Sequence, residues 1–113
     1  MEAAELINKY KSGKIDFSGA NLSTMNLENA DLIGIIFKEA DLHNTNLVFA
    51  YLNRADFSDA NLREINFSGA NLNQADLSRA NLQGANLHGT ILQRATLKEA
   101  NLSLANLLDA NLI

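Results

Sequence analysis

A five-residue period governs this sequence. Every fifth residue from position 17 to position 112 is Leu or Phe, twenty times out of twenty, without an insertion. On an α-helix, where successive residues are about 100° apart, such a series spirals around all sides and forms no apolar stripe. On a continuous β-strand, where side chains alternate with a period of two, successive members of the series fall on opposite faces. Neither element can bury this pattern, so a long helix and a long strand are both excluded.

The residues around each central Leu or Phe show how the chain can bury it. The residue two positions before the centre is small or apolar, fourteen times Ala, and the residue between them is Asn or Asp in sixteen units. A three-residue extended piece such as 20–22 therefore points its first and third side chains inward and its Asn outward. The other two positions hold turn formers, as in Ser18-Gly19 and Ser68-Gly69. A short straight side followed by a corner, repeated, predicts a coil whose central residues point at its axis.

This A(D/N)LXX pattern resembles that of the pentapeptide repeat proteins, over residues 15–113. The resemblance implies an all-β solenoid, the right-handed quadrilateral β-helix, with four pentapeptides per coil. The twenty units then make five coils, which start near Ile15, Ile35, Ala55, Ala75 and Ala95. Phenylalanines recur every twenty residues at Phe17, Phe37 and Phe57. In this register they are expected to stack on a single side of the square.

Residues 2–11 are predicted to form a short helix before the repeats. Its apolar face follows the i, i+3, i+4, i+7 spacing and consists of Ala3, Leu6, Ile7 and Tyr10. Gly13 stands where a helix stop is expected. We therefore predict an N-terminal capping helix in residues 1–14, which blocks the open β edge of the first coil, and a β-helix in residues 15–113. A membrane anchor is the alternative, but the apolar face is small and its charges are mixed.

The repeat runs to the last residue of the sequence, where no second cap follows it. An open coil edge that carries leucines invites another chain. The apolar residues at this end are Leu104, Leu107, Leu108, Leu112 and Ile113. Either two copies pair tail to tail, or the natural protein is longer and this sequence is a fragment. We expect a two-fold homodimer through the C-terminal coil, because the pairing of two identical ends removes the open edge.

The composition and the repeat register give no support to catalysis or metal binding. The chain has no Cys, which excludes disulfides and thiolate metal sites. Its two histidines, His43 and His88, fall on different sides and in coils two and four, so they cannot form a dyad or a metal pair. Serines follow many central residues, but no base accompanies them in register. We predict no catalytic residue, no metal site, no cofactor and no enzymatic activity.

Charge gathers on one side of the predicted square. The side of Phe17 carries the acids Asp16, Glu39, Asp56, Asp59, Asp76 and Glu99 against the bases Lys38, Arg79 and Lys98. Some pentapeptide repeat proteins are thought to mimic duplex DNA as acidic rods that bind a type II topoisomerase. Here bases and Ile36 interrupt the acidic side and the rod is short, so solubilising charge is the better explanation. A DNA-mimicking binder of gyrase is the alternative function.

Apolar residues at outward positions are the stronger anomaly. In coils one and two these positions hold Ile33, Ile36, Val48, Phe49 and Tyr51, most of them around one edge of the prism. An exposed Phe and Tyr flanked by aliphatic residues are typical of a protein interface. Local packing on stacked neighbours, or cover by the N-terminal helix, explains them equally well.

The whole sequence favours a non-enzymatic pentapeptide repeat protein that presents a rigid interaction or scaffold surface to a protein partner. The net charge is -4, from 13 acidic and 9 basic residues, which argues against a basic stripe for nucleic acid. No apolar run reaches the roughly 18 residues of a membrane span, and the first residues are too charged for a secretory signal. We therefore expect a cytoplasmic protein that binds neither membranes nor nucleic acid. It resembles the small members of the family that are abundant in cyanobacteria.

Overall fold

A computed structural model describes residues 1–112, which begin with one helix, α1 (Ala3–Lys11). Glu5 in its first turn and lysines in its last turn suit the helix dipole. The helix ends in a Schellman motif, in which Gly13 has a φ of 103°. The N–H of Gly13 donates to the carbonyl of Tyr10, and the N–H of Lys14 donates to the carbonyl of Lys9. The predicted helix is confirmed, and it begins one residue later than expected.

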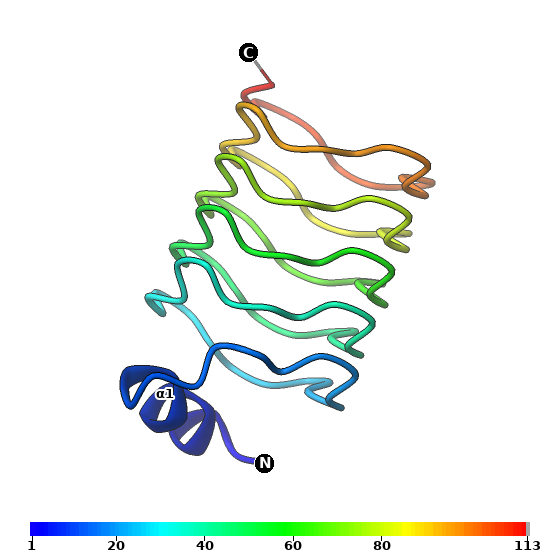
Figure 1. Ribbon diagram of the computed structural model, residues 1–113. Coiled ribbons are helices and arrows are strands. Elements are labelled where there is room, and N and C mark those ends of the chain that lie inside the picture. Colours follow the sequence, from blue (N-terminus) through cyan, green and yellow to red (C-terminus); the bar gives the residue numbers. More distant parts are fainter. Residues whose placement is uncertain (113) are drawn as a thin grey trace.

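The chain after α1 winds into a four-sided coil (Figure 1). Parallel bridges pair the residue before each centre with the residue twenty positions later, from Asp16 with Ile36 to Ile91 with Asn111. Within residues 1–112 these bridges are isolated and no continuous strand forms. Each straight side is therefore a single paired residue between two turns. The offset of twenty confirms four pentapeptides per coil.

We number the four sides by their central residues. Side one holds Phe17, Phe37, Phe57, Leu77 and Leu97; side two holds Leu22, Leu42, Leu62, Leu82 and Leu102. Side three holds Leu27, Leu47, Phe67, Leu87 and Leu107; side four holds Leu32, Leu52, Leu72, Leu92 and Leu112. Coils one to five start at residues 15, 35, 55, 75 and 95.

The central side chains fill the inside of the coil. All of those from Phe17 to Leu92 are buried. The predicted aromatic stack is present, with ring centroids 6.3 Å apart for Phe17 and Phe37 and 5.6 Å apart for Phe37 and Phe57. Phe67 meets Phe57 edge-on from the opposite side at 5.4 Å. Four aromatic rings thus form a continuous contact through the lower half of the core.

Every corner is a tight turn with a left-handed residue. In the first corner the N–H of Ala20 donates to the carbonyl of Phe17 at 3.2 Å, and Gly19 has a φ of 71°. The equivalent residue of the later corners also has a positive φ, and in 14 of them it is not Gly. Positive φ costs a residue with a Cβ some stability, so the coil holds these residues in place through its ladder. The ladder therefore keeps these residues in a backbone conformation that is locally unfavourable.

The Asn or Asp of each unit bonds to the backbone of its own turn. Its Oδ1 accepts the N–H of the residue two positions later, for example from Ser68 to Asn66 at 3.0 Å and from Asn73 to Asn71 at 3.0 Å. That N–H has no place in the ladder between coils, which uses three of the other four donors of the unit, while the fourth closes the turn. The outward orientation predicted for Asn and Asp is therefore only part of their role, which is mainly to cap the turn.

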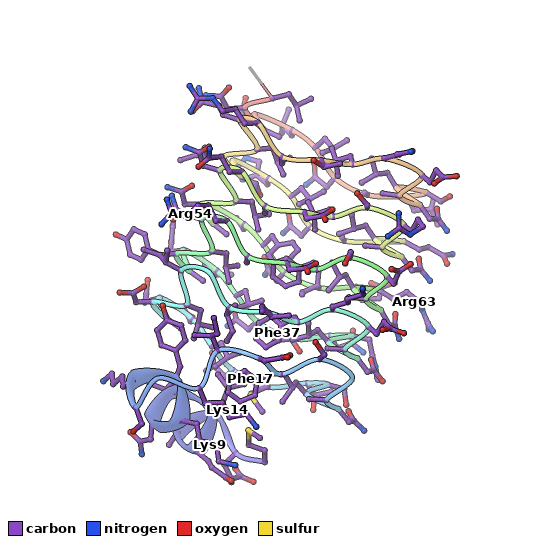
Figure 2. All side chains as sticks on the ribbon, viewed as in Figure 1. Lys9, Lys14, Phe17, Phe37, Arg54 and Arg63 are labelled. Atoms are coloured by element: carbon purple, nitrogen blue, oxygen red, sulfur yellow. The ribbon has the colours of Figure 1, made fainter. Side chains whose placement is uncertain are left out.

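The helix α1 covers one end of the coil, at the bottom of Figure 1. Leu6 is fully buried against the first coil. The Tyr10 hydroxyl donates to the carbonyl of Ile33 at 2.7 Å, and the Lys14 ammonium lies 5.1 Å from the centroid of the Phe17 ring. Figure 2 shows Lys14 beside Phe17 at this end. In residues 1–112, no helix has the length and apolar character needed to cross a membrane.

Candidate interaction surfaces

The apolar residues predicted to form a partner patch divide between the two corners that bound side four. Val48, Phe49 and Tyr51 lie at the corner between sides three and four, and Ile33 and Ile36 lie at the corner between sides four and one. Phe49 is 59% exposed and Tyr51 is 53% exposed, whereas Ile36 and Val48 are half-buried. The prominent part of the patch is thus the pair Phe49 and Tyr51, which we call the aromatic pair.

A glycine supports the aromatic pair. The Phe49 ring lies so close to Gly69, at the same corner in the next coil, that a Cβ on Gly69 would overlap the ring. Gly89 follows one coil further, and a Cβ there would meet nothing within 4 Å. The position of Phe49 at this corner therefore carries no side chain in coils three and four, where Ser68 and His88 precede the two glycines. The ring rests on bare backbone and its outer face stays accessible.

The acidic residues of side one lie together as predicted, but most are engaged locally. The Oδ1 atoms of Asp16, Asp56 and Asp76 each accept the N–H of the serine two positions later at 2.9 Å. The hydrogen bonds from Ser18 hold the pKa of Asp16 below its usual value. Arg79 binds Asp59 with two hydrogen bonds, at 2.9 and 3.1 Å, which lower the pKa of that carboxyl. The acidic side is a partly neutralised, hydrogen-bonded surface.

The two histidines lie on different sides, as predicted. His43 is on side two, where its Nδ1 lies 2.7 Å from Asp41 Oδ1. This contact lowers the pKa of Asp41. His88 is on side three, 3.5 Å from Asp109. Among residues 1–112, no three His, Asp or Glu side chains come close enough together to hold a metal ion.

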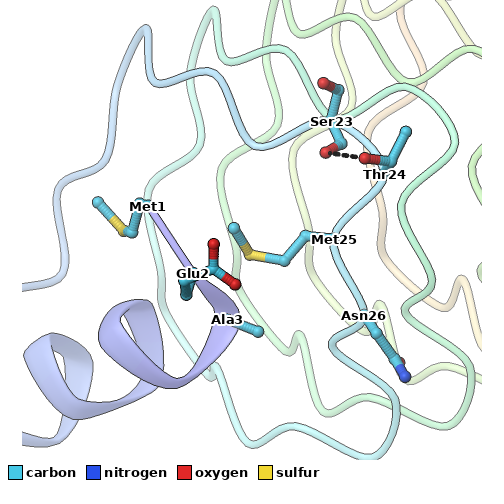
Figure 3. A pocket seen from close by; sticks show the side chains of 7 residues that line it. All are labelled: Met1, Glu2, Ala3, Ser23, Thr24, Met25 and Asn26. Carbon is cyan, nitrogen blue, oxygen red and sulfur yellow. Dashed lines mark hydrogen bonds between the residues drawn. The ribbon is translucent and has the colours of Figure 1, made fainter.

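A shallow pocket of about 330 Å³ lies between the start of α1 and coil one (Figure 3). It is lined by Met1, Glu2, Ala3, Ser23, Thr24, Met25 and Asn26. Its two hydroxyls are already committed, because Ser23 Oγ–H donates to Asn21 Oδ1 and Thr24 Oγ1–H donates to the carbonyl of Ser23. The lining also contains the carboxylate of Glu2, but neither hydroxyl donates to it, so the pocket shows no nucleophile paired with a base.

The opposite end of the coil is apolar and open among the described residues. Leu104 is 85% exposed, and Leu107, Leu108 and Leu112 are also exposed. Ile113, predicted to belong to this end, lies outside the described residues. The backbone edge is also open, since the N–H groups of Leu97 and Leu102 have no partner within residues 1–112. This end of the coil therefore combines exposed leucine side chains with unpaired backbone N–H groups.

Two features of the surface were missed by the sequence reasoning. The first is the capping bond of Asn and Asp, for which the pairing of Asn with turn residues was the only signal. The second is a pair of arginines, Arg54 and Arg94, which occupy the same position of side four in coils two and four. Their separation of forty residues, twice the length of one coil, is the signal that places them in one column.

Known proteins share both the repeat and the coil. The family model described as pentapeptide repeats matches residues 15–48, 25–59, 50–89, 60–98 and 80–113, with 8 copies. HetL, a pentapeptide repeat protein involved in heterocyst differentiation regulation from the cyanobacterium Nostoc sp. strain PCC 7120, has a similar structure. The TM-score is 0.78 at 37% identity, over 99% of this chain and 49% of HetL.

A sequence relative comes from another cyanobacterium. The uncharacterized protein slr1819 of Synechocystis sp. strain PCC 6803 is 54% identical over 39 residues, which are 34% of this chain and 12% of that protein. This chain spans about half the length of HetL and a smaller part of slr1819. The family match covers all of residues 15–113, and the bridges repeat at the offset that four pentapeptides require. The chain therefore belongs to the pentapeptide repeat family, and its fold is the right-handed quadrilateral β-helix.

Proposed function

We propose that this protein is a non-enzymatic scaffold that presents side four to a protein partner in the cytoplasm. The observation that carries the proposal is the exposure of the aromatic pair. Between positions 34 and 103, Phe49 and Tyr51 are the two large apolar residues that remain exposed. Both are held by the ladder or by a turn, so a partner meets a surface that is already ordered and loses little entropy on binding.

The absence of a catalytic arrangement within residues 1–112 supports a non-enzymatic role. Serine hydroxyls close turns on neighbouring Asp or Asn side chains, as Ser58 does on Asp56 at 2.6 Å. The similarity to HetL, which is described as involved in a regulatory process, supports an interaction role in the same general sense.

The proposal is tested by replacing the aromatic pair. Affinity capture with the native chain identifies a partner, whose binding is then measured directly with purified components. We expect Phe49→Ser combined with Tyr51→Ser to weaken this binding at least about tenfold, because aromatic anchors contribute most of the energy of such surfaces. The matched control, His43→Ser combined with Arg63→Ser on side two, should leave the binding unchanged. Equal binding by both double variants would contradict the proposal.

A homodimer through coil five is a second, independent proposal. In coils one to four the N–H of the central residue and the carbonyl of the small residue bond to the next coil, as Leu77 and Ala75 do with Thr96. In coil five the same groups, in Leu97 and Ala95, have no partner among the described residues. Two copies related by a two-fold axis run antiparallel, so this N–H and this carbonyl of one copy can meet those of the other.

Light scattering of the chain over a concentration series tests the dimer. We expect a dimer mass at micromolar concentration and a monomer mass for Leu104→Glu combined with Leu108→Glu, which places charges at the apolar end. A monomer mass for the unaltered chain at every concentration would contradict this proposal.

The DNA-mimic alternative finds less support in the geometry. The guanidinium of Arg79 offsets the negative charge of Asp59, and Lys38 and Lys98 lie on the same side. A gyrase supercoiling assay decides between the functions. We expect no inhibition at high micromolar protein, and dose-dependent inhibition that is lost when Asp56 and Asp76 are changed to Asn would favour the mimic.

A further inference from the structure

Side four carries a second pattern beside the aromatic pair. In coils two and four the residue before the centre is apolar, Tyr51 and Ile91, and the residue two after the centre is an arginine, Arg54 and Arg94. Bridges from Tyr51 to Asn71 and from Asn71 to Ile91 place the apolar residues in one column. The arginines share a second column at the neighbouring corner. The same surface motif therefore occurs twice, two coils apart.

In coils two to four this part of the molecule has no acidic residue. Sides three and four of coils two to four consist of residues 45–54, 65–74 and 85–94, which contain Arg54 and Arg94 but no Asp or Glu, although the chain has 13 acids. Neither guanidinium forms an ion pair with any residue from 1 to 112, whereas Arg79 on side one is paired. The two unpaired guanidinium groups give this surface a local positive charge in coils two to four, bounded by Asp31 below Tyr51 in coil one and by Asp56 next to Arg54 on side one.

Unused hydrogen-bonding groups lie between the two columns. Tyr51 and Ile91 have no carboxamide, so the N–H groups of Asn53 and Gln93 lack the capping acceptor that Asn71 gives to Asn73. The backbone carbonyls of an extended peptide are acceptors of the kind that these two N–H groups lack.

The spacing of the two arginines selects a conformation for this peptide. Stacked coils are about 4.8 Å apart, so the backbones of Arg54 and Arg94 are separated by about 10 Å. A polyproline II segment has three residues per turn and rises about 3.1 Å per residue, which puts side chains three positions apart on one face about 9 Å from each other. Two carboxylates with this spacing reach both guanidinium groups.

We infer that side four binds an acidic, extended segment of a partner protein, with carboxylates three residues apart on Arg54 and Arg94 and an apolar side chain on the aromatic pair. This inference rests on the proposed function and names the class of partner for the same surface. Charge complementarity supports this inference. The two guanidinium groups are unpaired, and a planar guanidinium can donate two parallel hydrogen bonds to one carboxylate. A nucleic acid fits less well, because its affinity depends on many phosphate contacts and this side offers two bases.

A synthetic peptide tests the inference. The probe is a fluorescent peptide with two glutamates three positions apart, separated by proline and leucine, and its binding is followed by fluorescence anisotropy. We expect saturable binding that weakens with salt and falls about tenfold or more in Arg54→Glu and in Arg94→Glu. The matched control is Arg63→Glu, which makes the same change in net charge on side two, at the opposite edge of the molecule in Figure 2. It should bind like the unaltered chain.

Several results would overturn the inference. These are no saturable binding up to about 1 mM peptide, equal weakening by Arg63→Glu, and equal or tighter binding of a lysine version of the peptide or of a single-stranded oligonucleotide. The proposed function is tested separately, by measuring how the same variants bind the captured partner. If Phe49→Ser weakens that partner while Arg54→Glu and Arg94→Glu do not, the interaction surface stands and the acidic segment is wrong.

Discussion

The Asn or Asp of each repeat completes the backbone hydrogen bonding of its unit. In residues 65–69 all five N–H groups have acceptors: one in the turn, one in the preceding coil, two in the following coil, and the fifth on Asn66 Oδ1. A buried or half-buried N–H without an acceptor costs free energy, so this side chain is a backbone cap like that of a helix. The abundance of Asn and Asp in the sequence follows from this role.

Asn66→Ala tests the cap in the middle coil. We expect a loss of about 0.5–2 kcal/mol in the free energy of unfolding, because the N–H of Ser68 loses its acceptor. Asn66→Asp keeps the acceptor oxygen and should stay within about 0.5 kcal/mol of the unaltered chain. Urea denaturation measures both. If Ala is as stable as Asn here, the cap has no energetic value.

Gly69 and Gly89 form a matched pair, at the same corner and with φ of 67° and 66°. Alanine at either position has to adopt positive φ, which costs about 1 kcal/mol. Gly69→Ala should cost more, because its methyl group displaces the Phe49 ring. In a Phe49→Ala background the two substitutions should become equal by chemical denaturation. A difference that persists without the ring would refute this explanation.

These residues also show where sequence reasoning reaches its limit. The alternation of side chains along an extended piece predicted correctly that Asn and Asp point outward and that the central residues point inward. It could not predict the hydrogen bond by which Asn or Asp caps the turn. Alternation gives the face on which a side chain lies, but it does not identify the N–H group that the side chain accepts. The register of twenty does place Gly69 next to Phe49, as it placed the stacked phenylalanines, but it does not tell that the Phe49 ring turns toward the glycine.

At the scale of elements, α1 is the capping helix of the first coil. It contributes Leu6 to the core and the Tyr10 hydroxyl to a carbonyl of the coil edge. The sequence predicted this element and its bounds within one residue, because its period of 3.6 differs sharply from the period of five that follows. The hydrogen bond of Tyr10 was not predictable, since it depends on the angle at which α1 crosses the coil.

Two substitutions separate the roles of α1. Leu6→Ala should cost about 2–5 kcal/mol, since it removes a fully buried side chain. Tyr10→Phe should cost about 1 kcal/mol, the typical net value of one hydrogen bond. Thermal unfolding followed by circular dichroism measures the loss of stability, and hydrogen exchange of coil one locates it. The capping role of α1 is wrong if the backbone amides of coil one exchange no faster in Leu6→Ala than in the unaltered chain.

At the scale of the whole molecule, stability comes from the stacking of coils. Burial of one Leu contributes about 1.5–3 kcal/mol, while ordering the five residues of its unit costs about 7 kcal/mol. A single coil is therefore unstable, and the ladder and core contacts between neighbouring coils have to provide the remainder. The cooperativity of unfolding should depend on an unbroken core.

Leu62→Lys tests this dependence in the middle coil, where Leu62 is fully buried. A buried ammonium without a partner is strongly unfavourable, so we expect the cooperative thermal transition to disappear. The neighbouring Arg63→Lys, at an exposed position, is the matched control and should melt like the unaltered chain. An unchanged, cooperative transition in Leu62→Lys would show that the core does not need this residue.

The twenty-residue offset of the bridges has a further consequence for how such a surface can change. Deleting or inserting one pentapeptide keeps Leu or Phe at every central position, although within coils one to three it separates stacked rings such as Phe37 and Phe57. It also moves each outward residue beyond that point to the next side, a quarter turn around the axis. A surface such as side four can thus be assembled, split or rotated by events that keep the interior of the coil apolar. A change in length of five residues therefore keeps the interior of this fold apolar, while it changes which outward residues share a side.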